Sequence, residues 1–397
     1  MTRVSLEENG GWRTCDLSSE VIAAATSAGL VESRLSRTGV EIAAASNKVG
    51  AVRWGDDEIL VRPKTPLGSL LFLLGYARDP GFRPEDVDAT PDDDLASAVA
   101  ETFARLAERA LARGVLQGYR TYDETAVTVR GRIRMSDQVS RGGRLLPLEL
   151  SIDEYTIDIA ENIVLRAALS ALLTLPRLRD ALRRRLVHLD GRLDGVERLR
   201  RGAPVPAVRR SRLNAHYAPA LAFAMLILER RSPSSAAGES PLASFVVDMA
   251  GLFESFVTTA LREALAPLSS GVTLAQYPAT LDERGRQPVR PDIVHVRSGR
   301  PRIVADAKYK TGASRVEDLY QMHAYCTVLG LRDGWLISVG RGRSSYSVRG
   351  AAVELHIRRL DLAAAPERLL EEVSSLAAEL VADRGHVTSE NDHPLTP

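Results

Sequence analysis

The sequence has 397 residues, of which 45% are hydrophobic and 26% are charged. This length exceeds one hydrophobic core of ordinary size, so we expect two or three domains. The 52 lysines and arginines nearly cancel the 51 aspartates and glutamates, so any contact with nucleic acid must come from a local patch. The two cysteines exclude a disulfide framework, a zinc knuckle and a four-cysteine iron–sulfur cluster.

The start of the chain has no apolar core for a signal peptide, and no apolar run in the sequence approaches the roughly 18 residues that suggest a membrane span. The small number of cysteines fits a reducing compartment. We therefore expect a soluble, cytoplasmic protein without a membrane partner.

The first region, residues 1–110, is expected to combine a small β unit with helices. Short alternating segments run from Val40 to Lys64 and are separated by turn-rich stretches. A compact apolar segment follows, and residues 79–94 form an acidic loop that contains prolines. Alanine and leucine then recur at helical spacing from residue 95 to Gly114, which suits a C-cap.

The second region, residues 111–235, is expected to be mainly helical and rich in arginine. Thr125–Met135 alternates as a strand would, and helical patterns follow at residues 156–175 and 214–231. Arginine dominates the segment between residues 177 and 212. This segment gives a strong local positive charge on a helical scaffold.

The third region, residues 236–383, begins in a small, polar stretch at 232–241. Its pattern predicts a helix over residues 242–265, three strands, a second helix and late strands, with a closing helix from Pro366 to Val381. Residues 384–397 lack the apolar side chains needed to fold and are predicted to be a disordered tail. The fold class of the chain is thus α/β, of the α+β type.

Residues 290–310, RPDIVHVRSGRPRIVADAKYK, place acids and a lysine on two otherwise apolar strands. Asp306 and Lys308 are two apart and share a face. A hairpin loop with an odd number of residues, with Gly299 or its neighbour in the left-handed region, would set Asp292 opposite Asp306. Like charges directly opposite each other weaken a sheet by up to about 1 kcal/mol, so the pairing needs compensation.

A divalent cation is the simplest compensation. Mg²⁺ binds one or two carboxylates and keeps positions for water and phosphate oxygens, and Mn²⁺ is an alternative. Such an ion activates water and withdraws charge from a phosphate, the two requirements of phosphodiester hydrolysis. Lys308 would orient the attacking water, and the Ala307 carbonyl would add a neutral ligand. The alternative is that Asp306 and Lys308 form a surface ion pair without further function.

The order of the motifs resembles the PD-(D/E)xK nuclease superfamily. A helix with glutamate (LFESFV), a strand with PD (RPDIV), a strand with DxK (VADAKYK) and a helix with QxxxY (DLYQMHAY) follow one another. More narrowly, these runs and the upstream runs VRGRIRM, DEYTIDIAENIVLRAAL and LNAHYAPALAFAMLIL look like the McrC family, the nuclease subunits of modification-dependent restriction systems. The resemblance implies a restriction-endonuclease-like core with the element order αβββαβ.

The resemblance also implies roles for individual residues. Asp292 and Asp306 match the metal ligands, and Lys308 matches the catalytic lysine. Glu254 matches the acid of the first helix, which helps to hold the metal or its water shell. An ordinary exposed helix glutamate is the alternative for Glu254.

Gln321 and Tyr325 stand four residues apart on one helical face and match the QxxxY pattern. The resemblance implies that Gln321 belongs to the catalytic set and that both side chains contact substrate phosphate. A surface glutamine and a core tyrosine are the alternatives for this pair.

No G-x-x-x-x-G-K-[ST] motif for nucleotide hydrolysis occurs in the sequence. Proteins similar to McrC dock onto a hexameric AAA+ partner that hydrolyses GTP, so the resemblance implies a GTPase or ATPase partner here. Residues 1–235 would enter or cap its ring, with residues 1–110 as the docking region. Recognition of a modified base is expected on that partner.

Arg183, Arg184 and Arg185 represent the arginine-rich segment and are candidate substrate-binding residues. Three roles stay open for them: a track along DNA phosphates, contact with an acidic rim of the partner, and a solvated helix face.

We therefore expect a Mg²⁺-dependent endonuclease subunit of a McrBC-like anti-phage restriction complex, which cleaves double-stranded DNA when docked on its partner. One alternative is a regulatory subunit that only stimulates the partner. Another is a DNA repair or processing exonuclease. The completeness of the predicted site argues against the first, and the lack of a helicase or cysteine cluster in the chain argues against the second.

Overall fold

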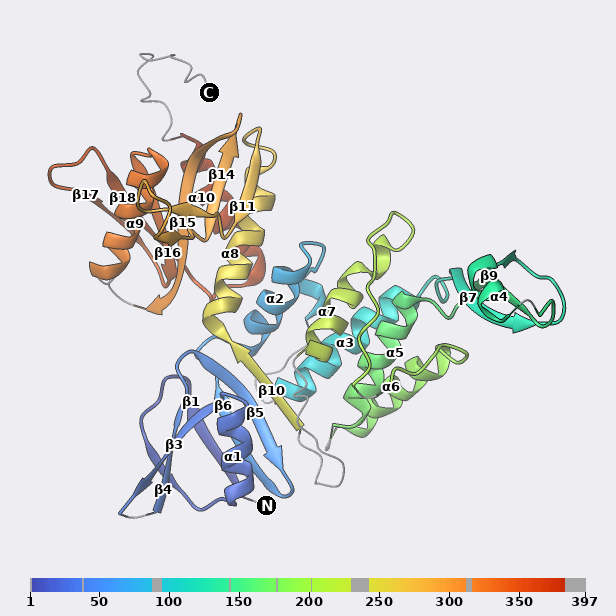
Figure 1. Cartoon of the computed structure of the whole chain (residues 1–397). Coiled ribbons are helices and arrows are strands. Elements are labelled where there is room, and N and C mark those ends of the chain that lie inside the picture. The colour runs from blue at the N-terminus through green and yellow to red at the C-terminus, as the bar shows by residue number, and fades with distance from the viewer. Residues whose placement is uncertain are drawn as a thin grey trace. The chain divides into compact units, whose positions relative to one another are not determined.

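The computed structural model describes residues 2–37, 39–87, 95–142, 144–175, 178–200, 202–229, 243–311 and 316–382. The chain forms two compact units, one made of residues 1–91 with 246–397 and the other of residues 92–245 (Figure 1). The predicted tail at 384–397 and the predicted linker at 232–241 lie outside the described residues. None of the helices within the described ranges is both long and apolar enough to cross a membrane.

This grouping differs from the three consecutive regions expected from the sequence. Residues 95–110 were expected in the first region, but α3 (Leu95–Leu111) packs against α6 (Asp180–Arg192) and α7 (Ala218–Glu229) in the second unit. Residues 1–91 share a unit with residues 246–397. The reason is apolar packing between elements that are far apart in the sequence.

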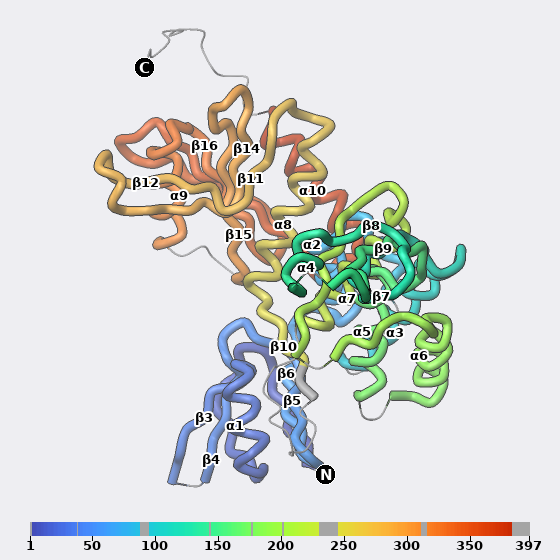
Figure 2. The backbone as a smooth tube through the Cα atoms, turned by 45° about the vertical axis from the view of Figure 1, so that its right-hand side comes forward, coloured from blue at the N-terminus to red at the C-terminus, as the bar shows by residue number. Residues whose placement is uncertain are grey.

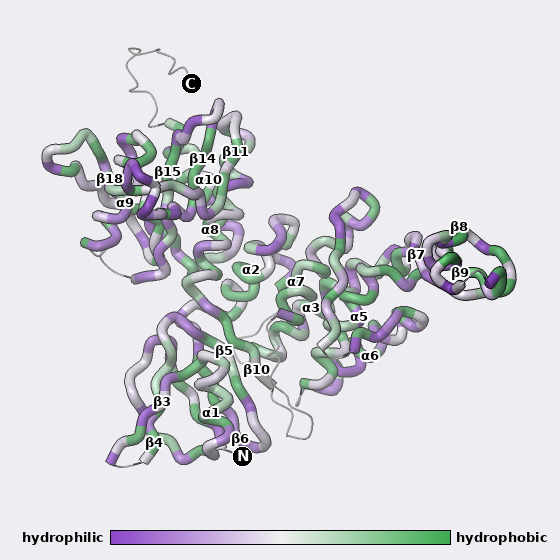
Figure 3. Tube along the Cα trace, in the orientation of Figure 1, coloured by the Kyte–Doolittle hydropathy of each residue, from purple (hydrophilic) through white to green (hydrophobic). Residues whose placement is uncertain are grey.

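The shared core of the first unit forms where α2 (Leu67–Arg78) packs against α8 (Met249–Leu265). Figure 3 shows that most of α2 is hydrophobic. Phe256 of α8 is fully buried, with ring centroids 6.3 Å from Phe72 and 5.7 Å from Tyr76. Thr259 Oγ1 donates a hydrogen bond to the Ala77 carbonyl at 3.1 Å. The N-terminal segment therefore completes the core beneath α8.

Two small sheets lie in the N-terminal part of this unit, as the alternation between Val40 and Lys64 predicted. The first contains, in spatial order, β1 (Arg3–Glu7), β6 (Asp57–Arg62), β5 (Lys48–Trp54) and β10 (Ala243–Asp248). The second contains β2 (Arg13–Cys15), β4 (Gly39–Ala44) and β3 (Val31–Ser36). The helical elements here are α1 (Ser19–Ser27) and the 3₁₀ turn η1 (Pro84–Asp86).

The helix predicted over residues 242–265 begins only at Met249. Its first residues form β10, which pairs with β5. The side chain of Asp248 accepts a hydrogen bond from the Ala250 amide at 3.2 Å and caps α8. Pairing with a distant strand overrides the helical spacing of these residues.

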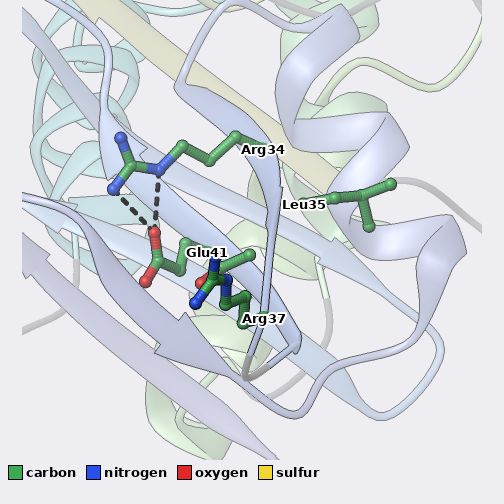
Figure 4. A pocket seen from close by; sticks show the side chains of 5 residues that line it. Arg34, Leu35, Arg37 and Glu41 are labelled. Carbon is green, nitrogen blue, oxygen red and sulfur yellow. Dashed lines mark hydrogen bonds and ion pairs between the residues drawn. The ribbon is translucent and has the colours of Figure 1, made fainter.

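A hollow on the β3–β4 hairpin is shown in Figure 4. Glu41 Oε2 lies 2.8 Å from Nε and 2.7 Å from Nη2 of Arg34, whose guanidinium covers the Trp12 ring at 4.2 Å. Leu35 at this hollow is exposed. The hollow contains none of the residues predicted for catalysis.

The second unit is mainly helical, as predicted. Its helices are α3, α5 (Ala160–Leu173), α6 and α7, with the 3₁₀ turn η2 (Ala215–Tyr217) before α7. A small sheet also lies here and contains, in spatial order, β7 (Gly118–Ala126), β9 (Leu148–Thr156) and β8 (Arg132–Ile133), with α4 (Met135–Ser140) after β8.

The strand predicted over Thr125–Met135 is wrong. β7 ends at Ala126, and the chain turns back through Gly131, which has φ +74. A Cβ on Gly131 would lie 2.3 Å from the Ser151 carbonyl oxygen, so glycine is required for this close approach of two backbones.

A six-stranded sheet forms the C-terminal part of the first unit (Figures 1 and 2). In spatial order its strands are β11 (Val272–Ala275), β14 (Ile293–Arg297), β15 (Arg300–Thr311), β16 (Asp333–Val339), β18 (Glu354–Leu360) and β17 (Arg343–Ser347). The other elements are α9 (Val316–Leu329), α10 (Pro366–Ala382) and the short pair β12 (Ala279–Thr280) and β13 (Pro288–Val289).

The order of these elements agrees with the predicted one. α8, β11, β14, β15, α9 and β16 follow one another along the chain, with the short strands β12 and β13 between β11 and β14. β14 pairs antiparallel with β15, and β15 pairs parallel with β16. The predicted closing helix begins at Pro366 as expected, whereas β17 was not predicted.

We predict that Phe256→Ala lowers the free energy of unfolding by roughly 3–5 kcal/mol, because it leaves a cavity between α2 and α8. Urea unfolding of the full chain measures this loss. Leu268→Ala is the control, since Leu268 is 46% exposed. A loss below about 1 kcal/mol for Phe256→Ala would contradict a core shared by the two segments.

Candidate active site

The hairpin of β14 and β15 brings Asp292 opposite Asp306. Ile293 pairs with Ala305 and Val294 with Val304, and the same register continues one step to Asp292, which directly precedes β14. The predicted pairing of the two acids is present.

The turn that produces this register is not the predicted odd-numbered loop. Ser298 and Gly299 form a two-residue turn and both have positive φ, at +51 and +73, as a type I′ hairpin requires. The expected left-handed conformation at Gly299 is confirmed. A two-residue turn alone would place Asp292 opposite Ala305.

A β-bulge corrects the register. His295 pairs with Ile303 but Val296 pairs with Pro301, so Arg302 is the extra residue. The added residue shifts by one every pair on the far side of the bulge from the turn, and this shift brings the two aspartates together. Because a one-residue slip turns every side chain to the other face, the bulge decides whether the acids meet.

Asp292 is buried, at 8% exposure, and both its oxygens have donors. Oδ2 accepts a hydrogen bond from the Ala307 amide at 3.0 Å, and Oδ1 accepts one from Gln276 Nε2 at 2.9 Å. The proposed ligand from Ala307 is its carbonyl, whereas the contact seen here comes from its amide. Asp292 is thus fixed from two directions.

Asp306 is 1% exposed, and its Oδ2 lies 2.6 Å from Lys308 Nζ. This contact is an ion pair, and Oδ2 forms no further contact that qualifies as a hydrogen bond among the described residues. Burial, followed by the charge of Asp292, raises the pKa of Asp306 to about 7. A buried carboxylate oxygen in this state suits a cation ligand.

Lys308 is half-buried beside these acids. Burial disfavours its ammonium form, but the charge of Asp306 and the contact with it outweigh burial and raise the pKa of Lys308. Lys308 therefore carries its positive charge at neutral pH.

Glu254 extends from α8 toward the same place. Its Oε1 accepts a hydrogen bond from Gln276 Nε2 at 2.5 Å. Burial, then the charge of Asp292, raises the pKa of Glu254, while Gln276 and Lys308 act in the opposite direction. The structure thus brings Glu254, Asp292, Asp306 and Lys308 together, as the sequence predicted.

The donor set of this site consists of carboxylate oxygens, which are the ligands that Mg²⁺ prefers. Ligand atoms of Glu254, Asp292 and Asp306 do not all lie within 4.8 Å of one another. Across the part of the chain that the structure describes, the group that meets this distance is Asp333, Glu354 and His356, which are not predicted site residues. Here His356 Nε2 contacts Asp333 Oδ1 at 3.1 Å.

Gln276 is a site residue that the sequence did not predict. It directly follows β11 and belongs to none of the motifs. The sequence shows only a polar residue after a strand. That position becomes informative once β11 is known to pair with β14, the strand that follows Asp292. The φ of Gln276, +49, is unusual for a residue with a side chain.

Gln321 and Tyr325 lie together on α9 as predicted. Gln321 Nε2 donates to the Tyr325 hydroxyl at 2.8 Å, and that hydroxyl contacts the Arg290 carbonyl at 3.4 Å. Tyr325 is buried in the same hydrophobic cluster as Met322, so it is a core ring with a polar end. Burial, followed by the charge of Asp306, raises the pKa of this hydroxyl.

Arg185 lies on α6 in the second unit and has internal partners. Its guanidinium contacts Glu101 and Glu108 of α3. The hydrogen bond with Glu108 is the largest cause that raises the pKa of Arg185. This role joins two helices and was not among the three that the sequence left open.

Arg183 also has internal contacts. Its Nη1 donates to the carbonyl of Leu173, the last residue of α5, at 3.2 Å, and its Nη2 donates to the carbonyl of Leu175 at 3.1 Å. Arg184 between them has an exposed side chain. Of the three candidate arginines, Arg184 is the one that is exposed, whereas Arg183 and Arg185 are partly buried.

The sequence profile of the McrBC 5-methylcytosine restriction system component family matches residues 43–338. The chain is similar to one in a refined half-complex from the tetradecameric assembly of Thermococcus gammatolerans McrB AAA+ hexamers with bound McrC, with 17% identity, a TM-score of 0.62, and coverage of 96% of this chain and 100% of that chain. A chain in the cryo-EM structure of the Thermococcus gammatolerans McrBC complex has 18% identity and a TM-score of 0.43, over 66% of this chain and 88% of that one. None of the curated proteins matches.

The first of these similarities shows the fold of the chain. The family profile extends over more than half of the sequence and includes the whole cluster from Glu254 to Tyr325. The chain therefore belongs to the family of McrBC 5-methylcytosine restriction system components.

Proposed function

We propose that the chain is the nuclease subunit of a McrBC-like restriction complex and hydrolyses phosphodiester bonds of double-stranded DNA. The observation that carries this proposal is the pair of buried, opposed aspartates, Asp292 and Asp306, with the Lys308 ammonium in contact with one of them. A sheet has no structural use for this arrangement. Family membership supports the restriction context.

Mg²⁺, or Mn²⁺, is the proposed cofactor. Asp292 and Asp306 would bind it directly, Glu254 directly or through water, and the carbonyl of Ala307 would be a further ligand. When bound, the ion would supply an acidic water and positive charge beside the phosphate. The buried, all-oxygen donor set of Asp292 and Asp306 fits such an ion.

Lys308 would act as a cation and not as a base. Because its pKa is raised, the ammonium stays protonated at neutral pH and can donate to the attacking water or to a phosphate oxygen. Gln321, with an exposed amide donor, and Tyr325 beside it would contact the substrate phosphate. The element order α8, β11, β14, β15, α9, β16 supports assignment to the PD-(D/E)xK superfamily.

We also propose that this chain works with a hexameric AAA+ GTPase or ATPase. The similar chain comes from McrB AAA+ hexamers with bound McrC, and this sequence lacks a nucleotide-hydrolysis motif of its own. Residues 1–110 are the proposed docking region. A regulatory subunit without catalysis is the alternative, and the complete acidic cluster disfavours it.

Asp306→Asn should lower DNA cleavage by the complex by at least the roughly 10–100-fold that loss of a residue orienting a metal ligand costs, because it removes a charged ligand and keeps the shape of the side chain. Stimulation of nucleotide hydrolysis by the partner should persist. DNA cleavage is measured on methylated and unmodified DNA, with GTP and with ATP. Nucleotide hydrolysis by the partner is measured as phosphate release.

Asp282→Asn is the matched control for this substitution. Asp282 accepts backbone hydrogen bonds from Arg286 and Gln287 in the loop between β12 and β13, outside the acidic cluster. The complex with Asp282→Asn should cut DNA at the rate of the original complex. Cleavage by Asp306→Asn at the rate of the original chain would refute the metal assignment.

Cation binding by the full chain should weaken as pH falls below about 7. Burial and Asp292 raise the pKa of Asp306 to about 7, so below this pH a proton competes with the cation. In metal-free protein the same raised pKa makes stability fall as pH rises from about 4 to about 7, because the ionised form is the one that burial disfavours. Calorimetric titration with Mn²⁺ across this range measures the affinity, and an affinity independent of pH would contradict the shift.

Arg184→Ala should flatten the dependence of DNA affinity on salt, by about 0.9 in the log–log slope for each phosphate that the protein no longer neutralises. Fluorescence anisotropy at several salt concentrations measures the slope. Arg113→Ala is the control, since Arg113 is also exposed in the second unit but lies outside the arginine-rich segment. An unchanged slope for Arg184→Ala would remove Arg184 from the DNA path.

A further inference from the structure

Gln276 connects two acids of the cluster through one nitrogen. Its Nε2 lies 2.5 Å from Glu254 Oε1 and 2.9 Å from Asp292 Oδ1. A side-chain amide has two N–H donors, so each acid receives one. Gln276 is therefore the side chain that links the acid of α8 to the acid before β14.

The backbone holds Gln276 in this place. β11 ends at Ala275, which pairs with Ile293. The Gln276 amide donates to the Asp292 carbonyl at 2.9 Å, and the Tyr277 amide donates to the Pro291 carbonyl at 2.9 Å. The main chain thus stays attached to the segment that carries Asp292.

Gln276 adopts φ +49 within this attached segment. The left-handed region is costly for a residue with a side chain and persists where the surroundings enforce it. Its side chain is exposed, so burial of Gln276 does not explain the conformation. In this conformation the side chain of Gln276 forms its two hydrogen bonds to Glu254 and Asp292.

Glu254 depends on this contact for its orientation. In the described part of the chain, the hydrogen bond from Gln276 is the one that its carboxylate accepts. Glu254 and Asp292 carry like charges on separate elements, and without a donor between them they would repel each other.

We propose that Gln276 is a positioning residue of the cation site, whose side-chain amide fixes Glu254 beside Asp292 so that both are available to one divalent cation. This inference rests on the proposed function. It assigns a site role to a position that no motif marks, and it makes the end of β11 a third contributor after α8 and the β14–β15 hairpin.

The test is calorimetric titration of Mn²⁺ into the metal-free full chain. Gln276→Met keeps the length of the side chain and the backbone strain but removes the donors. Gln276→Gly removes the side chain and relieves the strain. Loss of a residue that orients a metal ligand weakens metal binding by roughly 10–100-fold, and we expect both variants to fall in this range.

Cleavage by the complex gives a second readout. The cation concentration for half-maximal cleavage should rise in the same proportion for both variants, while cleavage at saturating cation stays close to that of the original chain. Ser298→Gly is the matched control. It also removes a side chain at positive φ, +51, but in the hairpin turn, and it should bind Mn²⁺ normally.

Mn²⁺ affinity within about twofold of the original chain in Gln276→Met and Gln276→Gly would overturn the proposal. Equal weakening in Ser298→Gly would overturn it too, since the effect would then not depend on the amide. An original chain that neither binds Mn²⁺ nor cleaves DNA would instead defeat the proposed function. The two failures are therefore distinguishable.

Discussion

Two like charges held face to face in a buried strand pair are the constraint on which this structure depends. Asp292 and Asp306 are buried, and their repulsion costs free energy that ordinary packing does not return. The surrounding groups all act on this cost: the Ala307 amide and Gln276 donate to Asp292, and the Lys308 ammonium stands beside Asp306. The ammonium is 2.6 Å from the buried Oδ2 of Asp306, so Lys308 is the group that balances the charge of that carboxylate.

The geometry of the hairpin makes this arrangement depend on a single residue. The two-residue turn at Ser298 and Gly299 would by itself place Asp292 opposite Ala305, and the extra residue Arg302 shifts the pairing by one step so that Asp292 faces Asp306. Loss of this shift would turn one aspartate to the opposite face of the sheet. The bulge is therefore part of the site although its side chain contributes nothing to the acidic cluster.

Much of the fold follows from local patterns in the sequence. The closing helix at Pro366 and the helix of Gln321 and Tyr325 have clear helical spacing, and the spacing of PD and DxK identified Asp292, Asp306 and Lys308. Local patterns gave the wrong prediction where contacts between residues far apart in the sequence determine the secondary structure or the partners of a side chain. Residues 243–248 form a strand because β5 pairs with them, and Arg185 pairs with Glu101 and Glu108 on another helix. Gln276 has no recognisable spacing, since its role arises from the register of β11 against β14.

The packing of α2 against α8 has a consequence for dissecting the protein. α8 carries Glu254, and the other side of that helix is completed by Phe72 and Tyr76 from the N-terminal segment. A fragment that begins at residue 246 would expose this apolar surface to water and lose the support beneath its acid. The C-terminal part of this unit is therefore not a detachable module, because its first helix needs α2 to cover its apolar side.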